Sequence, residues 1–121
     1  MWTGEQGRQA ERIAEDYLVK EKGFLIRERN YRFSRYEIDL IAEDERFLRI
    51  VEVKSLTSSV FKQPYESVDR KKKLNLIKAA AAYVRREKIR KEVVFDVVSI
   101  VFSETDPVIE YLPEAFSPIW I

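Results

Sequence analysis

The sequence predicts an α/β fold with elements in the order α-β-β-β-α-β-β. Three observations predict it. Helical periodicity appears near the N-terminus and again after Ser67, polar and apolar residues alternate over residues 36–54, and residues 93–102 form a nearly continuous β-branched run. The chain has 121 residues, of which 45% are apolar, enough for one hydrophobic core. We therefore expect a single domain over residues 1–121.

The first helix is predicted between Thr3 and Gly23. Residues 3–6 resemble a capping box, and glycine suits the left-handed position that ends a helix. Helical spacing gives a buried stripe of Ala10, Ile13, Ala14, Tyr17 and Leu18. Glu11 falls at the edge of this stripe and is expected to point along the core. The alternative is a partly exposed side chain paired with a neighbour such as Arg8.

Residues 24–29 predict the first strand, and residues 30–35 a connecting segment that contains Arg32 and Arg35 between aromatic residues. This mixture suits a nucleic-acid surface, because arginine reaches phosphate and a ring stacks on an unpaired base. The alternative is a loop that its aromatic residues anchor in the core, with solvated arginines.

Residues 36–54 predict a β-hairpin, because both halves alternate polar and apolar residues around an acidic turn. Glu37 and Asp39 share one face of the first strand, and Glu52 and Lys54 share one face of the second. With an even number of residues between the strands, Glu37 or Asp39 lies directly across from Glu52. With an odd number, the carboxylates lie on opposite faces of the sheet. Facing like charges cost about 0.2–1 kcal/mol, which a bound cation or Lys54 would offset.

The second half of the chain predicts a helix and two strands. A polar loop over residues 55–63 precedes a helix from Ser67, and residues 93–102 predict a central strand. A turn then leads to a strand at residues 108–112, and the apolar tail, residues 115–121, is expected to dock on the domain or on a second subunit. The helix is predicted to bury a stripe of Leu74, Ile77, Ala80, Ala81 and Val84.

Basic residues are concentrated in residues 70–91, which hold ten Lys or Arg and one acid. This segment carries +9 in a chain of net charge +1, so the remainder carries −8. Four of the bases occupy the first turns of the helix, where the helix dipole disfavours cations by about 0.3–1 kcal/mol. The pattern favours contact with phosphate. A solvated helix face, or a face that docks an acidic protein, is the alternative.

The residues that are absent also limit the chemistry. The chain has no Cys and no His, which excludes disulfides, thiol catalysis, histidine-based hydrolysis and the usual zinc sites. The N-terminus lacks an apolar signal core, and the apolar runs are too short to span a bilayer. We expect a cytoplasmic protein without membrane contact, whose catalysis would use carboxylates, Lys, Tyr or a hard metal ion.

The hairpin supplies candidate residues for phosphodiester hydrolysis. Asp39 and Glu52, with the backbone carbonyl of Val53, are predicted to bind Mg²⁺, and Glu11 would complete the ligands directly or through water. Lys54 would hold the attacking water or stabilise developing negative charge. The alternative is a solvent-facing hairpin whose Glu52 and Lys54 pair with neighbours. The predicted phosphate contacts are Arg32, Arg35, Arg70, Lys71, Lys72 and Lys73.

These residues resemble the YraN-type proteins, a bacterial family of restriction-endonuclease-like fold related to Holliday-junction resolvases. The resemblance covers most of the chain. It is carried by Ala10-Glu11, Tyr17-Leu18, Gly23, Asn30-Tyr31-Arg32, Glu37-Ile38-Asp39-Leu40-Ile41, Val51-Glu52-Val53-Lys54, Val68, Lys72, Phe95-Asp96-Val97-Val98 and Ala115-Phe116.

The resemblance implies a restriction-endonuclease-like three-layer fold, with a mixed β-sheet flanked by helices. It also implies Mg²⁺-dependent phosphodiester cleavage, with Glu11, Asp39, Glu52 and Lys54 at the site positions. Two departures bear on substrate choice: Tyr36 stands where the family usually has glycine, and Leu56 where it usually has arginine.

We expect an endonuclease that uses Mg²⁺ or Mn²⁺ on DNA, including branched DNA. If two sites cut symmetrically, it would act as a homodimer to which Trp120 or residues 55–63 contribute. The alternative is a nucleic-acid-binding module of nuclease fold without turnover. The role of Glu37, as a ligand, as a partner of one or as an exposed side chain, stays open.

Overall fold

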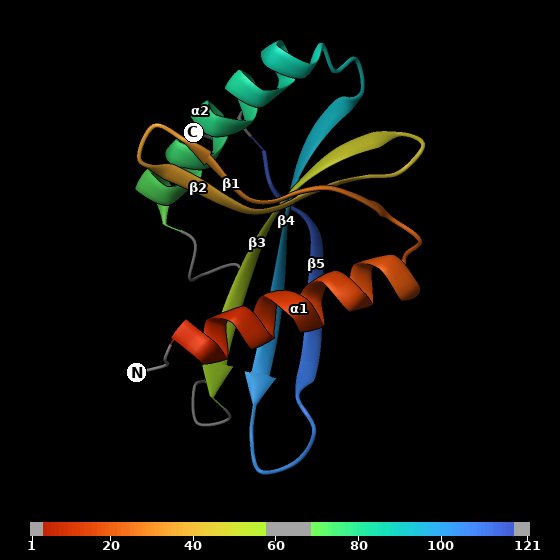
Figure 1. The fold of residues 1–121 in the computed structure, drawn as a ribbon, viewed down its shortest axis with the longest axis vertical. Coiled ribbons are helices and arrows are strands. Elements are labelled where there is room, and N and C mark those ends of the chain that lie inside the picture. The colour runs from red at the N-terminus through yellow and green to blue at the C-terminus, as the bar shows by residue number, and fades with distance from the viewer. Residues whose placement is uncertain (1–3, 58–68, 118–121) are drawn as a thin grey trace.

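The computed structural model describes residues 4–57 and 69–117, and these confirm the predicted order of elements (Figure 1). The elements are α1 (Gly4–Lys20), β1 (Leu25–Phe33), β2 (Tyr36–Glu43), β3 (Phe47–Thr57), α2 (Arg70–Glu87), β4 (Glu92–Phe102) and β5 (Val108–Phe116). Within the described residues, no helix is both long and apolar enough to cross a membrane.

The strands form one mixed sheet in the order β1-β2-β3-β4-β5. Strands β3 and β4 are parallel and pair along their whole length, from Phe47 opposite Glu92 to Thr57 opposite Phe102, while the other neighbours are antiparallel. The chain passes from β3 to β4 through α2, because parallel strands need a crossover connection. Strand β4 lies between β3 and β5 and buries most of its residues, as its apolar run predicts.

One helix covers each face of the sheet, which gives three layers (Figure 1). On one face, α1 contributes Ala10, Ala14 and Leu18, all fully buried, to a core with alternate residues of β2, β3 and β4. On the other face, α2 packs on the strand residues whose side chains point the opposite way, among them Leu48 and Ile50 of β3 and Phe95 and Val97 of β4. Helix α1 ends as predicted near Gly23, whose φ of 71° is left-handed and whose N–H donates to the carbonyl of Val19 at 3.1 Å.

The predicted buried stripe of α2 is partly wrong. The residues it buries are Leu76, Ala79, Ala80 and Tyr83, whereas Ala81 is exposed and Leu74 is 39% exposed. Tyr83 accounts for the difference, because its ring packs edge-on against Tyr31 while its hydroxyl accepts a hydrogen bond from Arg27. The helix begins at Arg70, capped by the Asp69 side chain. Ser67, its predicted start, lies outside the described residues.

Two segments predicted as loops belong to strands. Residues 30–33, predicted to connect, continue β1 and pair with β2, so only Ser34 and Arg35 form the turn. The left-handed Ser34, at φ 58°, makes this two-residue turn feasible. Of the alternative interpretation, a loop anchored by its aromatic residues, only the packing of Tyr31 against the core is confirmed, because the segment is a strand and Phe33 is 38% exposed. Residues 55–57 extend β3, because β4 offers them parallel partners.

The C-terminal tail docks on the domain as far as the structure describes it. Strand β5 runs to Phe116, four residues further than predicted, and passes Glu114 at a left-handed φ of 50°. The Phe116 ring is buried and stacks on Phe95, with ring centroids 5.0 Å apart. Trp120 and residues 58–63, predicted to contribute to a dimer, lie outside the described residues.

Candidate functional site

The candidate site lies where β2 and β3 stop pairing. Their ladder runs from Glu43 opposite Leu48 to Leu40 opposite Val51, and four residues separate the closing pair. This even number confirms the register in which Asp39 and Glu52 come next, on the same face. At this point a side chain replaces the backbone ladder, because Oδ2 of Asp39 accepts the Val53 N–H at 2.8 Å.

The half-buried Asp39 and the buried Glu52 form a carboxylate pair. Glu52 is 3% exposed, and its Oε1 atom is buried without a hydrogen-bond partner among the described residues. Burial and the adjacent Glu52 charge raise the pKa of Asp39 well above its ordinary value, against the opposing bond from Val53. Two carboxylates held together out of water require a proton or a cation between them.

Two lysines approach the pair from different elements. Nζ of Lys54, on β3, lies 3.4 Å from Oε2 of Glu52, and Nζ of Lys72, on α2, lies 3.2 Å from the same atom. Burial lowers the pKa of Lys72, but the Glu52 charge, followed by Asp39 and Glu37, raises it overall. Sequence analysis assigned Lys72 to phosphate contact, and the structure brings it to the carboxylates.

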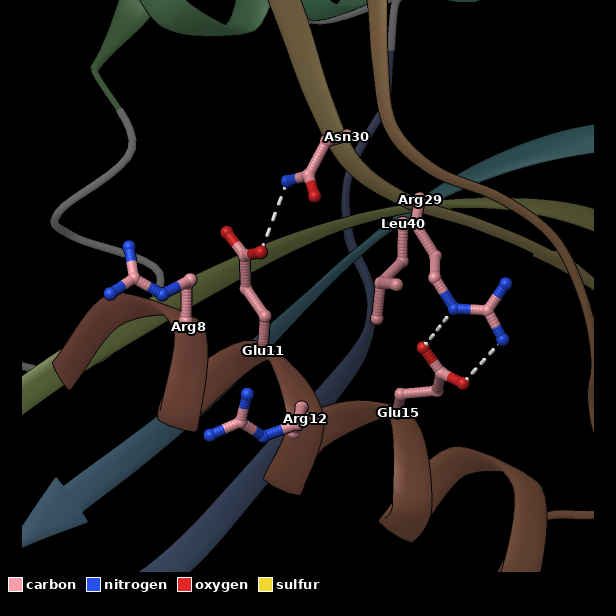
Figure 2. A pocket seen from close by; sticks show the side chains of 7 residues that line it. All are labelled: Arg8, Glu11, Arg12, Glu15, Arg29, Asn30 and Leu40. Carbon is pink, nitrogen blue, oxygen red and sulfur yellow. Dashed lines mark hydrogen bonds and ion pairs between the residues drawn. The ribbon is translucent and has the colours of Figure 1, made fainter. Parts of the chain in front are cut away.

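Glu11 reaches the site from α1 through an asparagine. Nδ2 of Asn30 donates to Oε1 of Glu11 at 3.0 Å (Figure 2). The same nitrogen donates to Oε2 of Glu37 at 3.3 Å. Glu11 is near enough to raise the pKa of Asp39. Asn30 has a left-handed φ of 49° and lies opposite Asp39 in the β1–β2 ladder. Sequence reasoning did not assign Asn30 a role, although a polar residue that tolerates this conformation inside a strand is a usable signal.

A pocket of about 160 Å³ adjoins Glu11 on the α1 side (Figure 2). Arg8 and Arg12 line it from the helix positions on either side of Glu11. Within residues 4–57 and 69–117 neither arginine has an ion-pair partner. Arg29, on the same pocket wall, is instead held by Glu15 through two bonds of 2.6 Å. Sequence reasoning missed both helix arginines, whose spacing of four residues on one helix face was the available signal.

The remaining predicted phosphate contacts are spread around the site. Arg32 forms an ion pair with Glu37 at 3.2 Å, and Arg35 is exposed in the turn that precedes β2. Arg70 and Lys71 are exposed in the first turn of α2. Nζ of Lys73 lies 5.2 Å from the centre of the Phe116 ring, which draws it toward the C-terminal strand.

The predicted metal ligands are assembled in part. Asp39, Glu52 and the backbone of Val53 are adjacent, whereas Glu11 is turned toward Asn30. No group of three acidic, His or Cys side chains close enough to hold a metal occurs in the part of the chain that the structure describes. The unpartnered Oε1 of Glu52 beside a second carboxylate is nevertheless a donor set that suits a hard cation.

Comparison with known proteins places the chain in a family. Residues 10–100 match the model of "Uncharacterised protein family UPF0102". The chain is 39% identical over 114 residues to a "UPF0102 protein" of Bacteroides thetaiotaomicron, covering 94% of this chain and 93% of the relative. It is 40% identical over 111 residues to one of Dictyoglomus turgidum, covering 87% and 94%. A third, of Persephonella marina, is 42% identical over 102 residues, covering 84% and 87%. With a family match over most of its length and relatives of similar size, the chain belongs to the UPF0102 family, also called the YraN family.

Proposed function

We propose that this protein is a metal-dependent endonuclease that hydrolyses phosphodiester bonds in DNA. The observation that carries the proposal is the pair formed by the half-buried Asp39 and the buried Glu52, in which one Glu52 oxygen has no hydrogen-bond partner among the described residues. A buried carboxylate oxygen without a donor is costly unless a cation binds it. The free-energy cost of burying this Glu52 oxygen is offset if the site binds a cation.

Asp39, Glu52 and the carbonyl of Val53 would hold Mg²⁺ or Mn²⁺, with Glu11 reaching the ion directly or through water. The ion, when bound, would neutralise charge on the scissile phosphate. Water adds to phosphorus and the bond to the leaving oxygen breaks, which yields one phosphate end and one hydroxyl end. Lys54 would orient that water or stabilise the negative charge that develops on the phosphoryl oxygens.

Lys72 acts as an internal counter-ion in this scheme. Its ammonium lies 3.2 Å from Glu52 and reduces the repulsion between the two carboxylates while no metal is present. Arg8 and Arg12, without ion-pair partners among the described residues, would bind DNA phosphates on the α1 side of the cleavage point. The exposed Arg35, Arg70 and Lys71 would do so on the α2 side.

The test is cleavage of linear, flapped and four-way-junction DNA with and without Mg²⁺ or Mn²⁺. We expect metal-dependent cleavage by the native chain, and its loss in Asp39→Ala and in Glu52→Ala. Glu45→Ala, which alters an exposed acid in the β2–β3 turn, is the matched control and should cut normally.

An absence of cleavage under every condition, with DNA binding unchanged in Asp39→Ala and Glu52→Ala, would contradict the proposal. The observation that favours this second candidate, a DNA-binding module without turnover, is that no complete set of three metal-binding side chains is assembled among the described residues.

A further inference from the structure

A second hollow lies on the α2 side of the candidate site and is lined in part by Glu37 and Lys72. Its inner part, of about 100 Å³, is lined by Arg35, Tyr36, Glu37, Lys72, Asn75 and Leu76. Its outer part, of about 320 Å³, is lined by Arg35, Tyr36, Lys71 and Asn75. Because three residues line both parts, we treat them as one and name it the Tyr36 pocket.

The Tyr36 pocket is continuous with the proposed active site through two of its lining residues. Lys72 binds Oε2 of Glu52 at 3.2 Å, and Glu37 shares the Asn30 amide with Glu11. A group bound in the pocket therefore lies next to the carboxylates that would surround a scissile phosphate.

The wall of the pocket combines an aromatic ring with unpartnered polar groups. Tyr36 is half-buried and packs against the apolar core, and its strand position is fixed by pairing with Phe33 across a two-residue turn. Within the described residues, Arg35, Lys71 and Asn75 have no side-chain hydrogen bond or ion pair. A fixed ring flanked by free cations and a free amide is suited to a base and its phosphate.

We propose that the Tyr36 pocket binds one unpaired nucleotide of the DNA substrate beside the cleavage point. The base stacks on the Tyr36 ring, with its edge toward Asn75 and the Glu37 carboxylate, which accepts from a base amino group. The phosphate lies at the outer end, where Arg35 and Lys71 are cationic and the wall, as far as residues 4–57 and 69–117 form it, contains no acid.

The contact disfavours an intact duplex, because a paired base would first have to be extruded from the stack at a cost in free energy. In a duplex each base is stacked on both faces and paired along its edge, so neither a ring nor an amide within a concave pocket can reach it. The substrate class is therefore DNA with single-stranded nucleotides next to the cleavage point, as at a flap, an overhang or a branch. This inference rests on the proposed function, because it takes the neighbouring carboxylates to be the cleavage site.

Binding without metal tests the pocket independently of cleavage. Fluorescence anisotropy of labelled DNA, measured in EDTA, would compare the affinity for an intact duplex with that for the same duplex carrying a single-stranded overhang. We expect Tyr36→Leu to weaken overhang binding about 10-fold and to leave duplex binding unchanged, because stacking is lost. Tyr36→Phe keeps the ring and should bind within about twofold of native. The matched control is Phe33→Leu, an exposed aromatic residue beside the pocket that does not line it.

A second measurement does not depend on the folding of a Tyr36 variant. Arg35→Gln should reduce the slope of log affinity against log salt by about 0.7 for the overhang DNA, because one single-strand phosphate contact is lost. Equal loss on duplex and overhang in Tyr36→Leu, no loss on either, or an unchanged salt slope in Arg35→Gln would overturn the inference. Selective overhang binding without cleavage in Mg²⁺ would support the pocket while contradicting the proposed nuclease.

Discussion

The Lys72 ammonium on α2 lies 3.2 Å from Oε2 of Glu52, whose other oxygen is buried without a hydrogen-bond partner among the described residues. This contact ties the second helix to the strand that carries the candidate ligands. It also supplies positive charge where two carboxylates meet. The lysine and a metal ion would therefore serve the same electrostatic need.

Replacing Lys72 with Met should lower the free energy of unfolding by about 1–2 kcal/mol, because a buried carboxylate loses a partner that is itself partly exposed. Urea denaturation measures this. Mg²⁺ should restore part of the loss in Lys72→Met and none in Glu52→Gln. Lys71→Met, one residue earlier and exposed, is the control. Equal destabilisation by both lysine variants would contradict the prediction.

Asp39→Asn should raise the free energy of unfolding by about 1 kcal/mol in the absence of metal. Burial and the Glu52 charge raise the pKa of Asp39, so ionised Asp39 is unfavourable in the fold, whereas Asn removes the charge and keeps an oxygen for the Val53 N–H. The same variant should lose metal-dependent cleavage. Thermal unfolding in EDTA, with Asp106→Asn on an exposed turn as control, measures the effect. A less stable Asp39→Asn variant would show that the carboxylate pair is not strained.

A buried ion pair on the α1 side should contribute more to stability than any group at the candidate site. Nη1 of Arg49 lies 3.1 Å from Oδ2 of the fully buried Asp96, which also accepts the Tyr111 hydroxyl at 2.6 Å and the Glu114 N–H at 2.9 Å. Asp96→Ala leaves Arg49 with Asp44 as its remaining ion-pair partner at 3.0 Å and leaves the Tyr111 hydroxyl and the Glu114 N–H without their acceptor, and should cost about 3–5 kcal/mol. Tyr111→Phe removes the bond to Asp96 and a longer one of 3.4 Å from Arg49, keeps the ion pair, and should cost about 1 kcal/mol. Similar urea midpoints for the two variants would contradict this ranking.

Glu43 should make stability depend on pH in acid. Its carboxylate accepts from Lys91 at 2.6 Å and from Arg27 at 3.0 Å, and the bond from Lys91 is the main cause of its lowered pKa. A carboxyl whose pKa is lower in the folded state stabilises above its unfolded pKa of about 4.3, and the contribution is lost as pH falls through the folded pKa.

Glu43→Gln should therefore cost about 1 kcal/mol at neutral pH, and the difference from native should shrink as pH falls below about 4. Urea denaturation at several pH values measures the difference. Glu110→Gln, an exposed acid on β5, should show no such pH-dependent difference and serves as control. A constant difference across that range would mean that Glu43 acts through packing instead of charge.

Local patterns predicted most of the fold. The alternation of residues 36–54 identified both strands that meet at the site, and the β-branched run identified β4 as a central strand. Prediction was less successful for a residue that combines an apolar ring with a polar group. Tyr83 is buried because its hydroxyl has partners on β1, and that compensation is invisible in the spacing of α2. Residues 30–33 were missed as strand because pairing with β2, not local propensity, holds them.

The sequence by itself determined which elements form and which residues alternate along each strand, since alternation is a local property. It left open whether Asp39 and Glu52 share a face, because that depends on the register between β2 and β3, which the structure fixed. Only the tertiary structure decided what surrounds them. Lys72 joins the carboxylates because α2 crosses between parallel strands, and Asn30 links Glu11 to Glu37 because α1 packs on the opposite face. These contacts join residues far apart in the chain, so their geometry depends on packing and leaves no periodic signal.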